Sequence, residues 1–153
     1  MARHRRFPLM GNILHFHVFS SEVGGKYCLV ESVVALGAGA PPNRHRDEEE
    51  VFTALEGTFA FYLDGVQHNV TTGAVVRVPN SALHHFCNTG STPGLLMIVN
   101  APGAIHDAFF SEMGTPVPED SWDLPPPGPQ PDFGAMVAKA ASLGVMIELP
   151  AAQ

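Results

Sequence analysis

The chain has 153 residues and a mass of 16.3 kDa, which is enough for one domain with one hydrophobic core. Apolar residues make up 45% of the sequence and charged residues 15%, a composition that argues against an intrinsically disordered chain. The formal net charge of −7 argues against a protein that binds the phosphate backbone of nucleic acids. The chain has eight histidines, as many as lysines and arginines together, so histidine chemistry is the feature to explain.

The sequence favours a cytoplasmic protein with no nucleic-acid or membrane partner. No apolar run approaches the roughly 18 residues that a membrane-spanning helix needs. The basic residues 3–6 resemble the start of a signal peptide, but His15 and His17 interrupt the apolar stretch behind them and no cleavage site of small residues follows. In this compartment we expect Cys28 and Cys87 to be free thiols rather than a disulfide.

Residues 13–100 are predicted to be β-structure almost throughout. Short runs rich in Val, Phe and Leu alternate with turn residues at intervals of roughly 8–12, which is the spacing of an antiparallel sandwich or barrel. Asp64-Gly65 has the composition of a two-residue hairpin turn, because both central positions of that turn need a positive φ. The predicted strands cover residues 13–19, 27–36, 51–55, 58–63, 66–70, 74–78, 84–88 and 95–99.

The character of the sequence changes after residue 100. Residues 104–113 predict one short helix, and half of the 14 prolines then fall within residues 116–131, which must be extended because proline lacks an amide donor. Asp132 is predicted to cap a helix that stops at Gly144, before a last strand at 145–149. We therefore divide the chain into an N-terminal arm (1–12), a barrel (13–103) and a C-terminal segment that straps across the barrel (104–153).

One stretch near the middle of the chain carries the strongest chemical signal. Asn43 and His45 are two residues apart, so on a strand their side chains face the same side. The polar residues 46–49, including Glu48, are expected to form a solvated loop. His45 can then end one strand while Glu50 begins the next, with both side chains aimed at one point.

A second stretch, residues 73–88, adds a further ligand candidate. His84 and His85 point to opposite faces of a predicted strand, and we expect His85 to point away from the site. Two imidazoles and one carboxylate form the ligand set of a 2-His-1-carboxylate site, which suits Fe(II), Mn(II), Ni(II) or Zn(II). We therefore predict that His45, Glu50 and His84 bind one divalent transition metal.

These two stretches resemble the two motifs of the cupin family. The first motif, G-x5-H-x-H-x3–4-E-x6-G, aligns with Gly37, Asn43, His45, Glu50 and Gly57. The second motif, G-x5-P-x-G-x2-H-x3-N, aligns with Gly73, Pro79, Ser81, His84 and Asn88. The tail, with Pro102-Gly103, Phe109-Phe110 and a Pro-rich segment, is similar to that of small single-domain cupins grouped with quercetin dioxygenase-like proteins. The resemblance implies an all-β jelly-roll barrel, or double-stranded β-helix, with a metal inside and frequently a homodimer.

The resemblance is incomplete at two positions. Ser81 stands where the motif has a turn glycine, which is tolerable if Ser81 keeps a negative φ. Asn43 stands where the motif has its first ligand histidine, and a neutral amide oxygen is a weaker ligand for transition metals than an imidazole. The centre then has three protein ligands with additional open positions, or binds metal weakly, or binds none.

Three further histidines are predicted to lie outside the site, and the position of Glu31 stays open. His15 and His17 share one face of a strand but have no carboxylate near them in sequence, and His106 is expected to be exposed. Glu31 lies in an apolar strand, where it either faces the pocket as a proton-handling group or faces solvent.

The resemblance favours a mononuclear metal-dependent oxygenase, a dioxygenase-like oxidoreductase acting on a small, aromatic molecule. Glu50 would also relay a proton, and the residues expected to contact the substrate are Asn43, Phe52 and Phe86. Phe52 lies two residues after Glu50, and Phe86 lies two residues after His84, so on a strand each ring faces the same side as the nearby ligand. The two rings therefore either line a pocket or fill the interior of the barrel. The alternatives are a metal-dependent isomerase or lyase, and a barrel that binds a small ligand without turnover.

Overall fold

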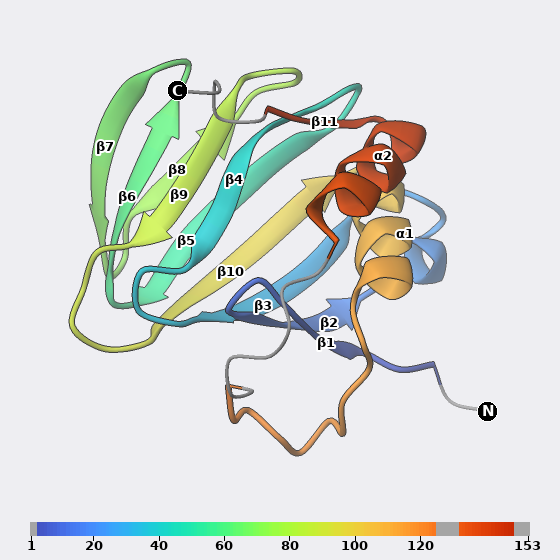
Figure 1. The fold of residues 1–153 in the computed structure, drawn as a ribbon, viewed down its shortest axis with the longest axis horizontal. Helices are drawn as coiled ribbons and strands as arrows, with labels where there is room; N and C mark the ends of the chain where they lie inside the picture. Colours follow the sequence, from blue (N-terminus) through green and yellow to red (C-terminus); the bar gives the residue numbers. More distant parts are fainter. Residues whose placement is uncertain (1–2, 125–131, 149–153) are drawn as a thin grey trace.

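The computed structural model describes residues 3–124 and 132–148, whose strands form two antiparallel sheets that face each other (Figure 1). The six-stranded sheet has the order β1 (Arg6–Leu9), β2 (Asn12–Val18), β3 (Cys28–Val34), β10 (Gly94–Ala101), β5 (Glu49–Glu56) and β8 (Val75–Val78). The five-stranded sheet has the order β11 (Val145–Ile147), β4 (Gly39–His45), β9 (His84–Asn88), β6 (Thr58–Leu63) and β7 (Val66–Thr71). The predicted fold class, an all-β double-stranded β-helix, is confirmed.

The core lies between the two sheets and is built from alternating apolar positions. In β3, Cys28, Val30, Ser32 and Val34 are buried while the residues between them are partly exposed, which is the period of two that a strand imposes. Aromatic rings from both sheets meet in the middle: Phe61 stacks on Phe86 at 5.1 Å, and Phe52 approaches Phe61 edge-on at 4.9 Å. The sheets are thereby held at the distance that leaves room for a pocket at one end.

Two strands depart from the simplest expectation. Residues 6–9, expected within an N-terminal arm, instead form β1, which pairs with β2 at the edge of the six-stranded sheet. In β4 the pairing with β9 shifts register between Ala40 and Asn43, where Pro41 and Pro42 supply no amide hydrogen to the ladder. This shift brings Asn43 directly opposite His84.

Ser81 adopts the conformation of the glycine that it replaces. Its φ is +63°, in the left-handed region, so Ser81 does not keep the negative φ under which the loss of the glycine would be tolerable without strain. The turn geometry therefore persists without the glycine, and the Ser81 amide donates to the carbonyl oxygen of His45 at 3.1 Å. This hydrogen bond ties the turn before β9 to the end of β4.

The helices of the C-terminal segment pack beside one end of the barrel (Figure 1). Helix α1 (Ala104–Met113) matches its predicted range, and helix α2 (Phe133–Leu143) is capped by Asp132 and ends at Gly144 with φ +96°, as predicted. Residues 115–124 form no helix or strand, although part of the predicted Pro-rich strap and residue 149 of the predicted last strand lie outside the described residues. A short 3₁₀ helix, Ser20–Val23, connects β2 to β3.

The helices of this segment are short. Within the described residues, no helix has the length and apolar character needed to cross a membrane.

Candidate metal centre

The turn between β4 and β5 brings two predicted ligands to the same point. β4 ends at His45 and β5 begins at Glu49, and Asp47 between them has a φ of +58°, which reverses the chain tightly. His45 and Glu50 are 6% and 4% exposed and face the interior together. The structure therefore gives these two residues the relationship that the spacing predicts.

Asn43 presents its side-chain oxygen to this centre. Its Nδ2 donates to the carbonyl oxygen of Pro41 at 2.8 Å and to that of His84 at 3.4 Å, so the amide orientation is fixed. Its Oδ1 therefore points at Nε2 of His45, at 2.6 Å. Asn43, which stands at the motif's histidine position, is therefore part of the cluster and contributes a neutral side-chain oxygen to it.

His84 reaches the centre from β9. Its Nε2 lies 3.0 Å from Oε2 of Glu50, and its Nδ1 lies 2.9 Å from the carbonyl oxygen of Ala82. His84 is 4% exposed. The three predicted ligands, His45, Glu50 and His84, are therefore brought together.

Two further residues join the cluster, and both were expected in solvent. His106 in α1 is 9% exposed and Glu48 is 2% exposed, so the predictions of an exposed histidine and a solvated glutamate are wrong. Nδ1 of His106 lies 2.7 Å from Oε1 of Glu48, and its Nε2 lies 3.4 Å from Oε1 of Glu50. The helix that follows the barrel thus inserts an imidazole between two buried carboxylates.

Both carboxylates are held in their ionised form. Burial opposes ionisation of Glu48, but hydrogen bonds from His106 and His45 outweigh it and lower the pKa of Glu48 to about 2. Burial also opposes ionisation of Glu50, and hydrogen bonds from His106 and His84 outweigh it, so the pKa of Glu50 falls well below its usual range.

The imidazoles respond in the opposite direction. Burial disfavours the protonated form of His84, but the hydrogen bond and charge of Glu50 outweigh it and raise the pKa of His84. His106 shows the same balance against Glu48 and Glu50, which raise its pKa to about 10. The cluster therefore attracts positive charge.

All three imidazoles are anchored through the same ring nitrogen. Nδ1 of His45 and of His106 faces Oε1 of Glu48, at 3.0 Å and 2.7 Å, and Nδ1 of His84 faces a backbone carbonyl. Because ionised carboxylates and carbonyls only accept hydrogen bonds, each Nδ1 carries a proton. A neutral imidazole then has a lone pair on Nε2, the arrangement in which a histidine binds a metal while a neighbouring group holds its ring.

The contacts of the three Nε2 atoms require a positive charge at the centre. Each Nε2 lies 2.6–3.4 Å from an oxygen of Asn43 or Glu50, and these oxygens are acceptors too. Two facing lone pairs repel unless a second proton on the imidazole or a metal cation lies between them. The donor set of imidazole nitrogens, a carboxylate and an amide oxygen fits a divalent transition metal.

Within the described residues, the ligand atoms of His45, Glu50 and His106 all lie within 4.8 Å of one another, close enough to hold one ion. This group differs from the predicted set because His106 takes the place of His84, which contacts Glu50 from β9. The sequence offered two signals for the missed residues. Glu48 has the same parity as Glu50, and His106 lies three and four residues before Phe109 and Phe110 on the apolar face of a helix.

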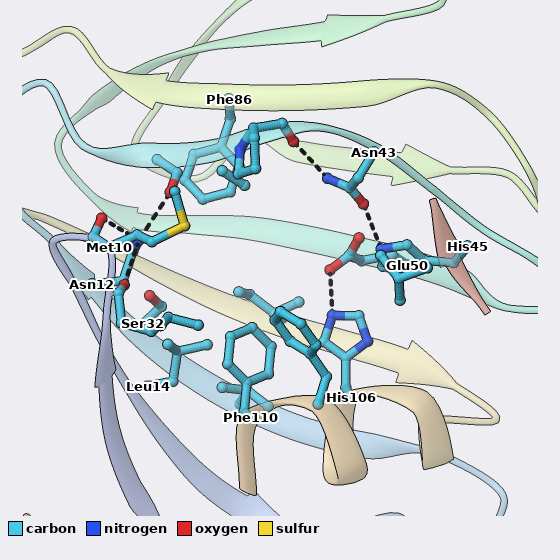
Figure 2. A pocket seen from close by; sticks show the side chains of 18 of the residues that line it. Met10, Asn12, Leu14, Ser32, Asn43, His45, Glu50, Phe86, His106 and Phe110 are labelled. Carbon is cyan, nitrogen blue, oxygen red and sulfur yellow. Dashed lines mark hydrogen bonds and ion pairs between the residues drawn. The ribbon is translucent and has the colours of Figure 1, made fainter. Parts of the chain in front are cut away.

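The cluster lies at one end of an apolar pocket with a cavity volume of about 110 Å³ (Figure 2). Phe52, Phe86 and Asn43, for which the sequence predicts substrate contact, all line this pocket, and substrate contact itself stays a prediction. Helices α1 and α2 contribute apolar side chains to the same wall, among them Phe110 and Met136. Among the described lining residues, none is a lysine or an arginine.

The other histidines lie away from the pocket. His85 stacks on Tyr62 with ring centroids 4.3 Å apart, and His17 pairs with Glu31 at 2.7 Å on the outer face of the six-stranded sheet. His15 shares that outer face, so the pair does not enter the pocket, and Glu31 takes the solvent-facing alternative. Cys28 and Cys87 are free, as predicted.

Comparisons with known proteins agree with this architecture. Residues 30–100 match the family model of the cupin domain. No curated protein matches the chain. A predicted oxalate decarboxylase from Thermotoga maritima superposes with a TM-score of 0.59 at 18% identity, over 64% of this chain and 90% of that chain.

Two further solved structures show the same relationship. An RmlC-like cupin from Shewanella frigidimarina superposes with a TM-score of 0.56 at 21% identity, over 65% of this chain and 85% of that chain. KdgF from Halomonas sp. gives a TM-score of 0.58 at 16% identity, over 65% and 86%. At such identities the likeness shows the fold alone, and the family match adds the domain. Residues 30–100 are therefore similar to the cupin domain, and the His–Glu cluster lies inside the double-stranded β-helix.

Proposed function

We propose that this chain is a metal-dependent cupin in which His45, Glu50 and His84, joined by His106, hold one divalent transition metal. The observation that carries the proposal is the shared anchoring of three imidazoles through Nδ1, which leaves each Nε2 facing an oxygen of Glu50 or Asn43. Fe(II), Mn, Ni and Zn all suit this donor set. When bound, the metal supplies Lewis acidity and, if it is iron, oxygen chemistry.

The leading activity is oxidation of a small, largely apolar and aromatic molecule, as in the quercetin dioxygenase-like cupins that the sequence resembles. The pocket beside the cluster is enclosed by Phe52, Phe86 and Phe110, and such walls favour a ring over a sugar or a small dianion. The absence of lysine and arginine among its described lining residues disfavours a phosphorylated substrate.

The residues around the centre have different roles in the proposed reaction. Glu50 contacts both His84 and His106 and lines the pocket, so it is placed to move a proton between the cluster and a bound molecule. Asn43 holds His45 in place from the opposite side to Glu48. Phe52 and Phe86 exclude water and orient the substrate ring.

Metal analysis of protein purified without a chelator tests the proposal. We expect about one equivalent of transition metal per chain, from purification or after anaerobic reconstitution with Fe(II). His45→Ala and His84→Ala should lose that metal, whereas His68→Ala, at an exposed position of β7, should keep it. A wild-type protein that stays metal-free after reconstitution would sink the proposal.

An isomerase or lyase is the second candidate, favoured by the ionised Glu50 beside His106, because a buried carboxylate–imidazole pair can exchange a proton without oxygen. An oxygen electrode separates the two activities. The oxygenase consumes O2 in proportion to product, and turnover that continues at the same rate under argon would overturn it in favour of the isomerase or lyase.

A further inference from the structure

The pocket has a second polar end, opposite the histidine cluster, and we propose that Asn12 there selects ligands that carry a hydroxyl or N–H donor. The ligand class is a ring-sized apolar molecule with that donor at one end and an oxygen ligand for the centre at the other. The orientation of the ligand rests on the proposed function, whereas the donor preference rests on Asn12 alone.

The amide of Asn12 is locked in one orientation. Asn12 begins β2 directly after the turn at Met10 and Gly11, which both have positive φ. Its Nδ2 donates to the carbonyl oxygens of Gly39, Leu9 and Met10 at 2.9, 3.2 and 3.2 Å. A flipped amide would place its oxygen against these acceptors, so Oδ1 must point the other way.

That oxygen is buried without a partner. Within the described residues, Oδ1 of Asn12 accepts no hydrogen bond, and the residue is only 7% exposed. Asn12 lines the pocket, and so does the hydroxyl-bearing Ser32, which is 1% exposed. A buried acceptor without a donor is costly, and a ligand that brings a donor removes that cost on binding.

The distribution of polar groups defines the shape of the ligand. In Figure 2, Asn12 and Ser32 lie at one side of the pocket, and Asn43, Glu50 and His106 lie at the other. Apolar side chains, including those of Phe86 and Phe110, lie between them. A cavity of about 110 Å³ is smaller than the roughly 150 Å³ apolar cavity that holds benzene, so the ligand has room for no more than a single ring.

Two acids that differ by one hydroxyl group test the donor preference. 4-Hydroxybenzoate and benzoate both offer a carboxylate to the centre, and only the first offers a donor at the opposite end. Their dissociation constants are measured by calorimetry for the wild type, for Asn12→Leu and for the control Asn69→Leu, at an exposed position of β7. We expect the affinity ratio of 4-hydroxybenzoate to benzoate to fall about 5–10-fold in Asn12→Leu and to stay unchanged in the control.

An unchanged ratio in an Asn12→Leu protein that still binds benzoate would overturn the inference. So would a wild type that binds no 4-hydroxybenzoate at about 10 mM. If Asn12→Leu does not fold, because it loses the three Nδ2 hydrogen bonds, a crystal structure of the wild type with 4-hydroxybenzoate decides. A phenolic oxygen within hydrogen-bond distance of Asn12 Oδ1 supports the inference, and any other position of that oxygen refutes it.

The same titrations with zinc-loaded and with EDTA-treated protein separate this inference from the metal centre. A hydroxyl preference that persists after EDTA treatment supports the role of Asn12 even if the chain binds no metal. A chain that binds zinc but shows no hydroxyl preference keeps the proposed function and loses the recognition site.

Discussion

Nδ1 of His106 lies 2.7 Å from Oε1 of Glu48, inside the end of the barrel. The same oxygen accepts from Nδ1 of His45 at 3.0 Å and from Nδ2 of Asn100 at 3.1 Å. One carboxylate oxygen therefore connects the end of β4, strand β10 and helix α1. Because it orients two of the three imidazoles, Glu48 controls the centre without facing the pocket itself.

Replacing Glu48 with glutamine should weaken metal binding. Glu48→Gln keeps the size of the side chain but removes the charge that holds both Nδ1 protons, so the rings of His45 and His106 lose their fixed orientation. We expect a loss of about 10–100-fold in zinc affinity, measured by competition with a chromophoric chelator.

The neighbouring residue provides a matched control. Glu49→Gln changes an exposed glutamate that pairs with Arg77 on the surface, so its zinc affinity should equal that of the wild type. Equal losses in the two variants, or a Glu48→Gln protein with wild-type affinity, would refute the role of Glu48.

Restoring the motif's histidine should strengthen the centre. Asn43 supplies one neutral oxygen beside His45, and an imidazole is a better ligand for a transition metal than an amide oxygen. Asn43→His should therefore raise zinc affinity about 10-fold or more, whereas Asn80→His, at an exposed turn position, should not. An Asn43→His protein with unchanged affinity would place Asn43 among the substrate contacts instead.

Much of the barrel was predictable because strand signals are local. The strands at residues 58–63 and 84–88 match their predicted bounds residue for residue, since dense apolar runs lie between clear turn residues. The convergence of His45 and Glu50 also follows from local order, because the turn between them needs few residues and reverses the chain at Asp47. Side-chain parity then placed His84 on the correct face.

The positions of His106 and Glu48 depend on tertiary packing, which the spacing of residues in the sequence does not encode. Helix α1 follows Gly103, and the φ of +87° at Gly103 sets the direction in which the helix leaves the barrel. Only that direction brings His106 to the carboxylates of Glu48 and Glu50. Glu48 lies in a run of acidic residues, a pattern that is typical of a solvated loop. Its burial depends on hydrogen bonds with Asn100 and His106, which are more than 50 residues away in the sequence. Charged groups are buried where partners meet them, and besides the nearby His45 the partners of Glu48 are distant in sequence.

Metal affinity should rise with pH. The pKa of His106 is raised to about 10, so His106 holds a second proton at neutral pH when no metal is bound, and the pKa of His84 is raised by its contact with Glu50. Metal binding must displace the second proton of His106, and zinc affinity should therefore rise about 10-fold per pH unit between roughly pH 6 and 8, and more steeply where His84 is also protonated. Calorimetry in buffers of different ionisation enthalpy counts the protons released, and a pH-independent affinity would contradict the assignment of these histidines as ligands.

The same pKa shifts predict how the stability of the metal-free protein depends on pH. A histidine whose pKa is raised on folding contributes stability that is complete below its ordinary pKa of about 6.5. For His106 this contribution is lost as the pH rises towards about 10, so urea midpoints of the EDTA-treated protein should fall over that range. His106→Gln should flatten this decline, and a variant that declines as steeply as the wild type would assign the effect to another group.

Close pairing of β4 with β9 is what places Asn43 opposite His84, and Gly39 makes that pairing possible. A Cβ atom at Gly39 would lie 1.8 Å from the carbonyl oxygen of Phe86, a backbone atom that cannot rotate away. Gly39→Ala should therefore force the two strands apart, lower the free energy of unfolding by about 1–3 kcal/mol and weaken zinc binding.

Gly134→Ala is the matched control, because among residues 3–124 and 132–148 a Cβ there meets only Asp132 Oδ1, at 3.4 Å, and alanine favours the helix that contains it. Its unfolding free energy should stay the same or rise by up to about 1 kcal/mol, with zinc affinity unchanged. Urea denaturation and zinc titration of both variants separate a general loss of stability from a displaced site. If Gly39→Ala loses stability but binds zinc as the wild type does, the centre does not depend on the register between Asn43 and His84.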